Sequence, residues 1–288
     1  MTATDGVGSA AIITPTHSGD VERTRLLVDS YRRTSTQLPL FLIAHTEDRD
    51  LFADLRGSGV ELLTTADVLP DRVERRRRNR YRRRDPRRYV EGKPLHGWTS
   101  QQLVKLAAPS VIGTDIVFCV DSDVLLLQPL ELDHGRNADH APLIFESSDD
   151  NALTMSWAIK SMELLGVDLR DAVLRQYTHQ GVCLHRATCE RLRDYLEERT
   201  STAWWQVFLR EGLAEYQTYG VFARDVDKQS PLVPAPPLDI LTYWTDPGDI
   251  LQRVVGEIRA RAPLGVCIQS NLGIPAADIS AALAPLWS

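Results

Sequence analysis

The sequence is poor in the residues and segments that define several specialised protein classes. It has only four cysteines in 288 residues, and their scattered positions indicate neither a disulfide framework nor a zinc site. It has no apolar run approaching the ~20 residues that a membrane-spanning helix needs. Its first ten residues lack the basic and apolar regions of a signal peptide, so we expect a cytoplasmic protein with reduced thiols.

Lysine is also scarce, with 4 Lys against 29 Arg. Eleven of the arginines, and only two acidic residues, lie within residues 72–88, which gives this segment a formal charge of +9. Because the net charge of the chain is −6, the remainder carries −15. A basic segment on an acidic body indicates recognition of an anionic partner, although a solvated surface loop or helix is the plainer interpretation.

What is present is an ordinary globular composition, with 43% hydrophobic and 25% charged residues. Short apolar runs predict buried strands, and the longer periodic segments between them predict helices. The predicted strands cover residues 10–14, 39–45, 60–63, 115–120 and 181–185, and the predicted helices 21–33, 152–165, 189–198 and 203–211. A Pro-rich loop is expected over residues 229–238. This alternation predicts an α/β fold with a mixed, mainly parallel sheet flanked by helices.

One more helix is predicted from its start and stop signals. Thr99 and Gln102 have the spacing of a capping box, and Trp98 and Leu103 have that of a hydrophobic staple. We therefore expect this helix to begin after Thr99 and to end before Pro109.

The strongest chemical signal is an Asp-x-Asp pattern, Asp121 and Asp123, directly after the apolar strand that ends at Val120. The pattern occurs twice more, but only here does it follow an apolar strand. If the chain stays extended, both carboxylates point to one face, at the carboxyl end of a strand, where open α/β sheets bind ligands. Two neighbouring carboxylates repel each other, and Mg²⁺ or Mn²⁺ would relieve the repulsion. The alternative is a solvated turn in which an aspartate caps the next element.

Several motifs together resemble the GT-A glycosyltransferases, in particular a group of small bacterial members, some of them in natural-product biosynthesis. The resemblance extends over residues 11–275 and rests on the order of its motifs. These are Ile12–Thr16, Trp98 with Gln101–Leu106, Val120–Val124, Glu215-Tyr216-x-x-Tyr219-Gly220 and Ile268–Asn271. It implies a GT-A, Rossmann-like fold in which residues 1–130 form the donor-binding half and residues 131–288 the acceptor-binding half of one domain.

The resemblance also implies the donor site. The donor would be a nucleotide diphosphate sugar, with a UDP-sugar such as UDP-GlcNAc or UDP-Glc favoured. Thr14, Pro15 and Thr16 would border the nucleotide. The cofactor-binding residues would also include Lys105, which is otherwise a surface lysine, together with Asp121 and Ser122. Mn²⁺ or Mg²⁺ would be held by Asp121, Asp123 and Asn271, although relatives often have His where Asn271 stands.

The catalytic candidates lie in the second half of the chain. Inverting transfer needs a general base, and Glu215 is the first candidate, although a helix-end glutamate beside two core tyrosines is the alternative. Asp150, next to Asp149, is the second, with an ordinary acidic turn as its alternative. His179 could contact the acceptor or the diphosphate, although a lone histidine is more often a packing residue.

The acceptor would be a small molecule or one tethered to an acidic carrier protein that docks on Arg72–Arg88. Nucleic acid is not an expected partner, because few aromatic residues interleave with the arginines and the body is acidic. Two other functions stay open. One is a haloacid-dehalogenase-type phosphohydrolase, in which Asp121 would be the nucleophile, but that motif normally lies near the chain start. The other is a non-catalytic module that binds acidic partners through the Arg-rich segment.

Overall fold

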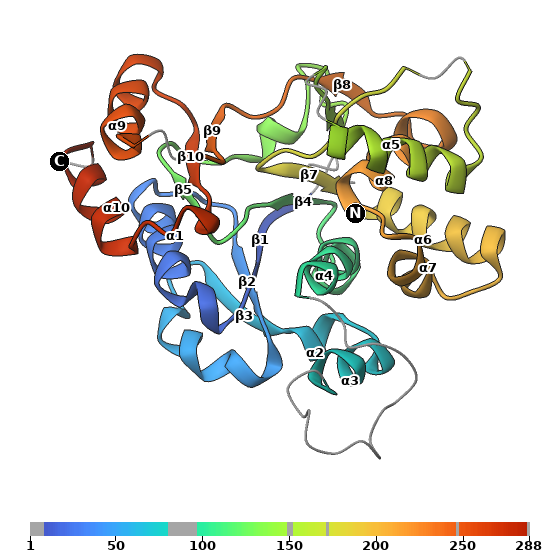
Figure 1. The fold of residues 1–288 in the computed structure, drawn as a ribbon, viewed down its shortest axis with the longest axis horizontal. Helices are drawn as coiled ribbons and strands as arrows, with labels where there is room; N and C mark the ends of the chain where they lie inside the picture. Colours follow the sequence, from blue (N-terminus) through green and yellow to red (C-terminus); the bar gives the residue numbers. More distant parts are fainter. Residues whose placement is uncertain (1–8, 80–96, 149–151, 171–172, 246–247, 287–288) are drawn as a thin grey trace, which may run out of the picture.

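The computed structural model describes residues 9–79, 97–148, 152–170, 173–245 and 248–286 (Figure 1). Its centre is a five-stranded sheet with the strand order β3-β2-β1-β4-β7. The strands are β1 (Ala10–Thr16), β2 (Leu40–Ala44), β3 (Val60–Thr64), β4 (Ile116–Cys119) and β7 (Val182–His185). The first four run parallel to one another, and β7 is antiparallel to β4. The predicted α/β class with a mainly parallel sheet is confirmed.

Helices cover both faces of this sheet, as the alternation of side chains along β1 requires (Figure 1). Ile12 packs in one apolar cluster with Leu27 of α1 (Val21–Arg33). Its neighbour Ile13 packs in the other with Leu103 of α4 (Gly97–Ile112). Both isoleucines are fully buried, so the core lies on both sides of the sheet.

The other elements lie around this centre. A second sheet has the order β5-β10-β9, and β6 pairs with β8. These strands are β5 (Val124–Leu126), β6 (Leu143–Phe145), β8 (Val233–Ala235), β9 (Ile240–Tyr243) and β10 (Gly265–Ile268). The remaining helices are α2 (Thr65–Val68), α3 (Asp71–Asn79), α5 (Ala152–Leu165), α6 (Arg186–Thr200), α7 (Trp204–Glu211), α8 (Glu215–Val221), α9 (Ile250–Arg261) and α10 (Ala276–Leu283). None of the helices within the described residues has the length and apolar character needed to cross a membrane.

Two local predictions are wrong. Helix α4 begins at Gly97 and continues through Pro109. The carbonyl of Pro109 accepts a hydrogen bond from the amide of Gly113 at 3.0 Å, so helical hydrogen bonding extends beyond the proline. Gln102 is therefore inside the helix, where its Oε1 accepts a hydrogen bond from the amide of Glu215 at 3.0 Å. The Pro-rich segment 229–238, predicted as a loop, contains β8. β8 is an edge strand, where the missing amide hydrogen of Pro234 is tolerated.

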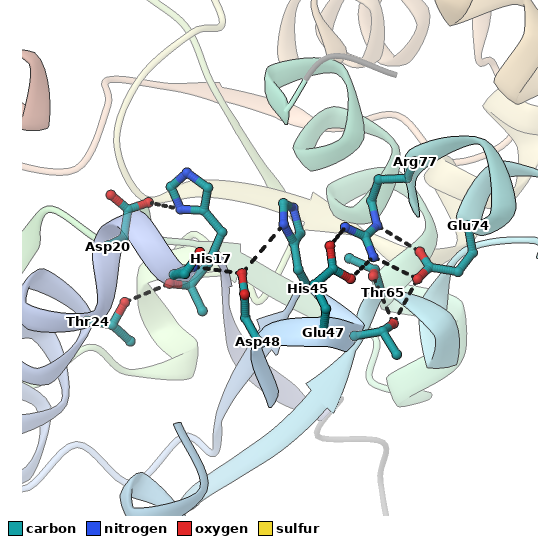
Figure 2. Close-up of polar contacts among 12 residues, drawn as sticks. His17, Asp20, Thr24, His45, Glu47, Asp48, Thr65, Glu74 and Arg77 are labelled. Atoms are coloured by element: carbon teal, nitrogen blue, oxygen red, sulfur yellow. Dashed lines mark hydrogen bonds and ion pairs between the residues drawn. The ribbon is translucent and has the colours of Figure 1, made fainter. Parts of the chain in front are cut away.

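The Arg-rich segment begins as a helix, α3, and residues 80–96 lie outside the described residues. Arg72, Arg75 and Arg78 are exposed, as a solvated face predicts. Arg77 departs from this expectation, since only 2% of it is exposed. Its guanidinium donates to both carboxylate oxygens of Glu47, at 2.6 and 2.8 Å, and to both of Glu74, at 2.7 and 2.8 Å (Figure 2). Arg77 thus fastens α3 to the segment that follows β2.

We expect replacement of Arg77 by Met to destabilise the fold strongly. The substitution leaves Glu47 and Glu74 without a cation, and breaking the buried pair of Arg77 with Glu74 costs about 3 kcal/mol. Urea denaturation measures the free energy of unfolding. The control is Arg78→Met on the exposed face of α3, which should change stability by about 0.5 kcal/mol or less. Equal effects of the two substitutions would show that the Arg77 bridge does not hold α3.

Candidate active site

Asp121 and Asp123 lie in the connection between β4 and β5, at the carboxyl end of the parallel strands. The chain is not extended there, because the amide of Val124 donates to the carbonyl of Asp121 at 3.1 Å and closes a turn. The expectation that the two carboxylates share one strand face is therefore wrong. Asp121 faces α4 and the segment before β7, whereas Asp123 faces β10 and the residues after it.

Asp121 is held by two side chains. Its Oδ1 lies 3.0 Å from the Lys105 ammonium, and its Oδ2 accepts a hydrogen bond from Gln180 Nε2 at 3.0 Å. Burial alone would raise the pKa of Asp121, but the charge of Lys105 and the two hydrogen bonds outweigh it and lower that pKa. Asp121 is thus an anion in a fixed orientation.

Asp123 is buried and has no cationic side chain in hydrogen-bond contact with it within the described residues. Its Oδ1 accepts a bond from Cys267 Sγ at 3.3 Å, and its Oδ2 accepts one from the amide of Ser270 at 3.1 Å. Burial, and then the nearby charge of Asp121, raise the pKa of Asp123 to about 6. The two aspartates therefore repel each other through space, even though they face different elements.

Lys105 joins Asp121 to the acidic residue of the second half. Its Nζ lies 3.2 Å from Glu215 Oε1 and 4.5 Å from the centre of the Tyr216 ring. Glu215 is 5% exposed and begins α8. Burial raises the pKa of Glu215, and the charge of Lys105 only partly offsets this. A carboxylate with a raised pKa is suited to accept a proton near neutral pH. The surface-lysine interpretation of Lys105 is wrong, since the residue is 6% exposed.

A cavity of about 570 Å³ brings these residues together. Its wall includes Lys105, Asp121 and Glu215, together with His179, which the sequence predicted, and Gln180. His179 Nε2 lies 3.0 Å from the carbonyl oxygen of Gln176. The cavity has the size and the few convergent polar groups of a small-molecule site.

The residues at the Asp-x-Asp motif have the chemistry to hold a divalent cation. Burial, and then the charge of Asp121, make the ionisation of Asp123 costly, and a bound cation would offset that cost. No group of three or more His, Cys, Asp or Glu within the described residues could hold a metal by itself. Mg²⁺ commonly uses one or two carboxylates and takes its other ligands from phosphates and water. Asn271, the third predicted ligand, is exposed and follows Ser270, whose amide contacts Asp123.

The other predicted site residues either make structural contacts or lie outside the described residues. Thr14 Oγ1 donates to the carbonyl of Val120 at 2.8 Å, and Thr16 Oγ1 shares a hydrogen bond with Thr24 Oγ1 at 2.7 Å. Both hydroxyls are buried, as is Pro15, so they hold the strand end in place. Ser122 is also buried, in the turn of the motif. Asp150 and its neighbour Asp149 lie outside the described residues.

A second polar cluster, not foreseen from the sequence, lies where β1 and β2 end (Figure 2). His17 and His45 meet edge to face, with ring centres 5.6 Å apart. His17 Nδ1 lies 2.9 Å from Asp20, and this hydrogen bond raises the pKa of His17. Burial, and then the charge of Arg77, lower the pKa of His45 to about 4, so His45 is neutral at pH 7.

Sequence reasoning also missed Gln180 and Tyr216 as partners of the predicted residues. Tyr216 was visible as the neighbour of Glu215, but nothing local distinguishes a ring that stacks on Lys105 from a core tyrosine. Gln180 gives no local signal, because its partner Asp121 is 59 residues away.

Comparisons with known proteins give a family match and two structural likenesses. A model described as "Family of unknown function (DUF6492)" matches residues 9–231. No curated protein matches the sequence significantly. The chain is similar to the apo crystal structure of mouse xyloside xylosyltransferase 1, with 9% identity, a TM-score of 0.48 and coverage of 92% of this chain and 99% of that one. It is also similar to the apo structure of the bifunctional glycosyltransferase WbbM, with 11% identity, a TM-score of 0.43 and coverage of 92% of this chain and 47% of that one.

The raised pKa of Asp123 predicts a pH-dependent stability. An unfolded aspartate has a pKa of about 3.9, so between pH 4 and pH 6 the folded state binds more protons than the unfolded state. The stability from the protonated carboxyl is present below pH 4 and is lost as pH rises through 6. Relative to wild type, the free energy of unfolding of Asp123→Asn should therefore rise by up to about 3 kcal/mol between pH 4 and pH 8, at about 1.4 kcal/mol per unit of pKa difference.

Urea denaturation in metal-free buffer at the two pH values measures this difference. Asp50→Asn is the matched control, since Asp50 is an exposed aspartate of another Asp-x-Asp pattern. Because Asp50 is exposed, its replacement should change the free energy of unfolding by about 0.5 kcal/mol or less at either pH. A difference for Asp123→Asn that is the same at both pH values would contradict the electrostatic description of the motif.

Proposed function

The chain belongs to the DUF6492 family of unknown function, and we propose that it is a glycosyltransferase that takes a sugar from a nucleotide diphosphate donor. The observation that supports this most directly is the joining of two acidic sites by one buried lysine. Lys105 links Asp121, in the Asp-x-Asp motif that ends β4, to Glu215, and all three line one cavity. The motif order that resembles GT-A glycosyltransferases supports the same function.

The donor in this proposal is a UDP-sugar such as UDP-GlcNAc or UDP-Glc. Asp123 and Asp121 would hold Mn²⁺ or Mg²⁺, which when bound neutralises the negative charge that develops on the leaving diphosphate. Asn271 is positioned one residue beyond the amide that holds Asp123, where its side-chain oxygen is a further candidate ligand.

The side chains that line the cavity would carry out the sugar transfer. Glu215 removes the proton from an acceptor hydroxyl as that oxygen attacks the anomeric carbon, while the bond from this carbon to the diphosphate oxygen breaks. Attack from the side opposite the leaving group inverts the anomeric configuration. Lys105 keeps Asp121 and Glu215 apart and in place, since it contacts both carboxylates. Docking of an acidic carrier protein on Arg72–Arg88 stays a prediction.

The donor part of the proposal predicts metal-dependent nucleotide binding that needs Asp123. A thermal-shift and donor-hydrolysis screen of UDP-, GDP- and TDP-sugars, with and without Mn²⁺, should show one nucleotide that raises the Tm only when the metal is present. Asp123→Ala should abolish that shift, because it removes a carboxylate that would hold the metal.

Asp50→Ala is the control for this screen and should keep the shift, since Asp50 lies in a different Asp-x-Asp pattern and is exposed. If no nucleotide shifts the wild type, the glycosyltransferase proposal is wrong. A phosphohydrolase would instead release inorganic phosphate from phosphomonoesters added to the same protein.

The role of Glu215 predicts a separation of binding from turnover. Glu215→Gln keeps the size of the side chain but cannot accept the proton, so kcat for transfer should fall about 10²- to 10⁴-fold. The nucleotide-dependent thermal shift should stay as in wild type. Glu198→Gln, an exposed position on α6, is the control and should transfer normally. Unchanged turnover in Glu215→Gln would assign the base to another residue.

A further inference from the structure

Three tryptophans line the cavity. Trp98, in the first turn of α4, stacks on Trp157 of α5, with ring centres 5.7 Å apart and planes 26° from parallel. Trp244, just after β9, also lines the cavity. Trp98 is 42% exposed and Trp244 is 60% exposed. Large apolar surfaces that stay exposed around one cavity indicate a binding site.

Polar side chains line the same cavity. They include Gln176, Thr178 and Gln180 on the segment before β7, and Thr242 on β9. Gln176 Oε1 and Thr178 Oγ1 are both buried, and neither has a hydrogen-bond partner within the described part of the chain. Buried polar atoms of this kind cost free energy until a ligand or water pairs with them.

We infer that the acceptor bound in this cavity is a carbohydrate, whose ring stacks on the tryptophans and whose hydroxyls pair with Gln176 and Thr178. The inference deepens the proposed function and depends on it for the reaction, but not for the binding. A pyranose ring has an apolar C–H face and an edge of hydroxyls, so one ligand suits both the aromatic and the polar side chains.

Other classes of acceptor fit this wall less well. A flat aromatic molecule or an alkyl chain would cover the tryptophans but would offer no hydrogen bond to Gln176 or Thr178, so their buried polar atoms would stay unpaired. A phosphorylated acceptor would place negative charge next to Asp121 and Glu215, where Lys105 already serves both carboxylates.

The proposed general base lies in the same cavity as the tryptophans. Glu215 lines the same cavity as Trp98 and Trp157, and it is the residue proposed to remove the acceptor proton. A ring stacked on these tryptophans would therefore share the cavity with the Glu215 carboxylate. An acceptor sugar thus meets both the binding and the proton-transfer requirements of the site.

Direct binding tests the inference without any turnover. Saturation-transfer NMR and titrations would use methyl glycosides of glucose, galactose, mannose, xylose, rhamnose and N-acetylglucosamine, with 1-naphthol as the flat aromatic probe. Each is measured with and without UDP and Mn²⁺. We expect at least one glycoside to bind, and its ring C–H protons to receive the strongest saturation.

Variants then test the stacking surface. Trp98→Ala should weaken binding of that glycoside about tenfold, whereas Trp98→Tyr, which keeps an aromatic face, should restore most of it. Val111→Ala is the matched control, because Val111 is an exposed apolar residue of the same helix that does not line the cavity. It should bind like wild type. Circular dichroism and Tm show that each variant is folded.

The outcomes separate this inference from the proposed function. If no glycoside binds, or if Trp98→Ala binds it as well as wild type, the carbohydrate inference is wrong. It is also wrong if 1-naphthol binds and the glycosides do not. Donor hydrolysis with Mn²⁺, measured without any acceptor, reports on the proposed function alone. Hydrolysis without glycoside binding would therefore overturn only the inference, and glycoside binding without nucleotide binding would overturn only the proposed function.

Discussion

The site depends on one buried ammonium group. Lys105 Nζ lies 3.0 Å from Asp121 and 3.2 Å from Glu215, over the ring of Tyr216. A buried charge is tolerated only when it is paired, and here one cation satisfies two carboxylates from distant parts of the chain. Without it, the end of β4 and the start of α8 would bring two anions together. This contact joins the two elements at the wall of the cavity.

The same charges explain why the Asp-x-Asp motif suits a cation. When ionised, Asp121, Asp123 and Glu215 carry three negative charges, and Lys105 supplies a single positive one. Burial, and then the charge of Asp121, raise the pKa of Asp123 to about 6. A divalent cation shared with a diphosphate would balance this excess, whereas the cavity beyond Asp121 has aromatic and neutral polar walls suited to an uncharged acceptor.

The sequence was informative where the signal is local. Apolar runs located the strands of the central sheet, and helix α5 was predicted with the bounds that the structure shows. The position of Asp121 and Asp123 at a strand end was also foreseen. The turn within the motif was not foreseen, because it is closed by a single hydrogen bond from the amide of Val124 to the carbonyl of Asp121. The stacking of Trp98 on Trp157 and the contact of Lys105 with Glu215 join segments 59 and 110 residues apart, and no local pattern encodes such contacts.

The central claim is that the Asp-x-Asp motif at the end of β4 is the metal and diphosphate site of a glycosyltransferase. Anomalous diffraction from crystals grown with UDP and Mn²⁺ tests it most directly, because manganese can be located without reference to activity. We expect one strong anomalous peak within coordination distance of the Asp123 carboxylate, with the diphosphate of UDP on its other side. A peak at another place in the molecule, or UDP bound away from Asp123, would contradict the claim.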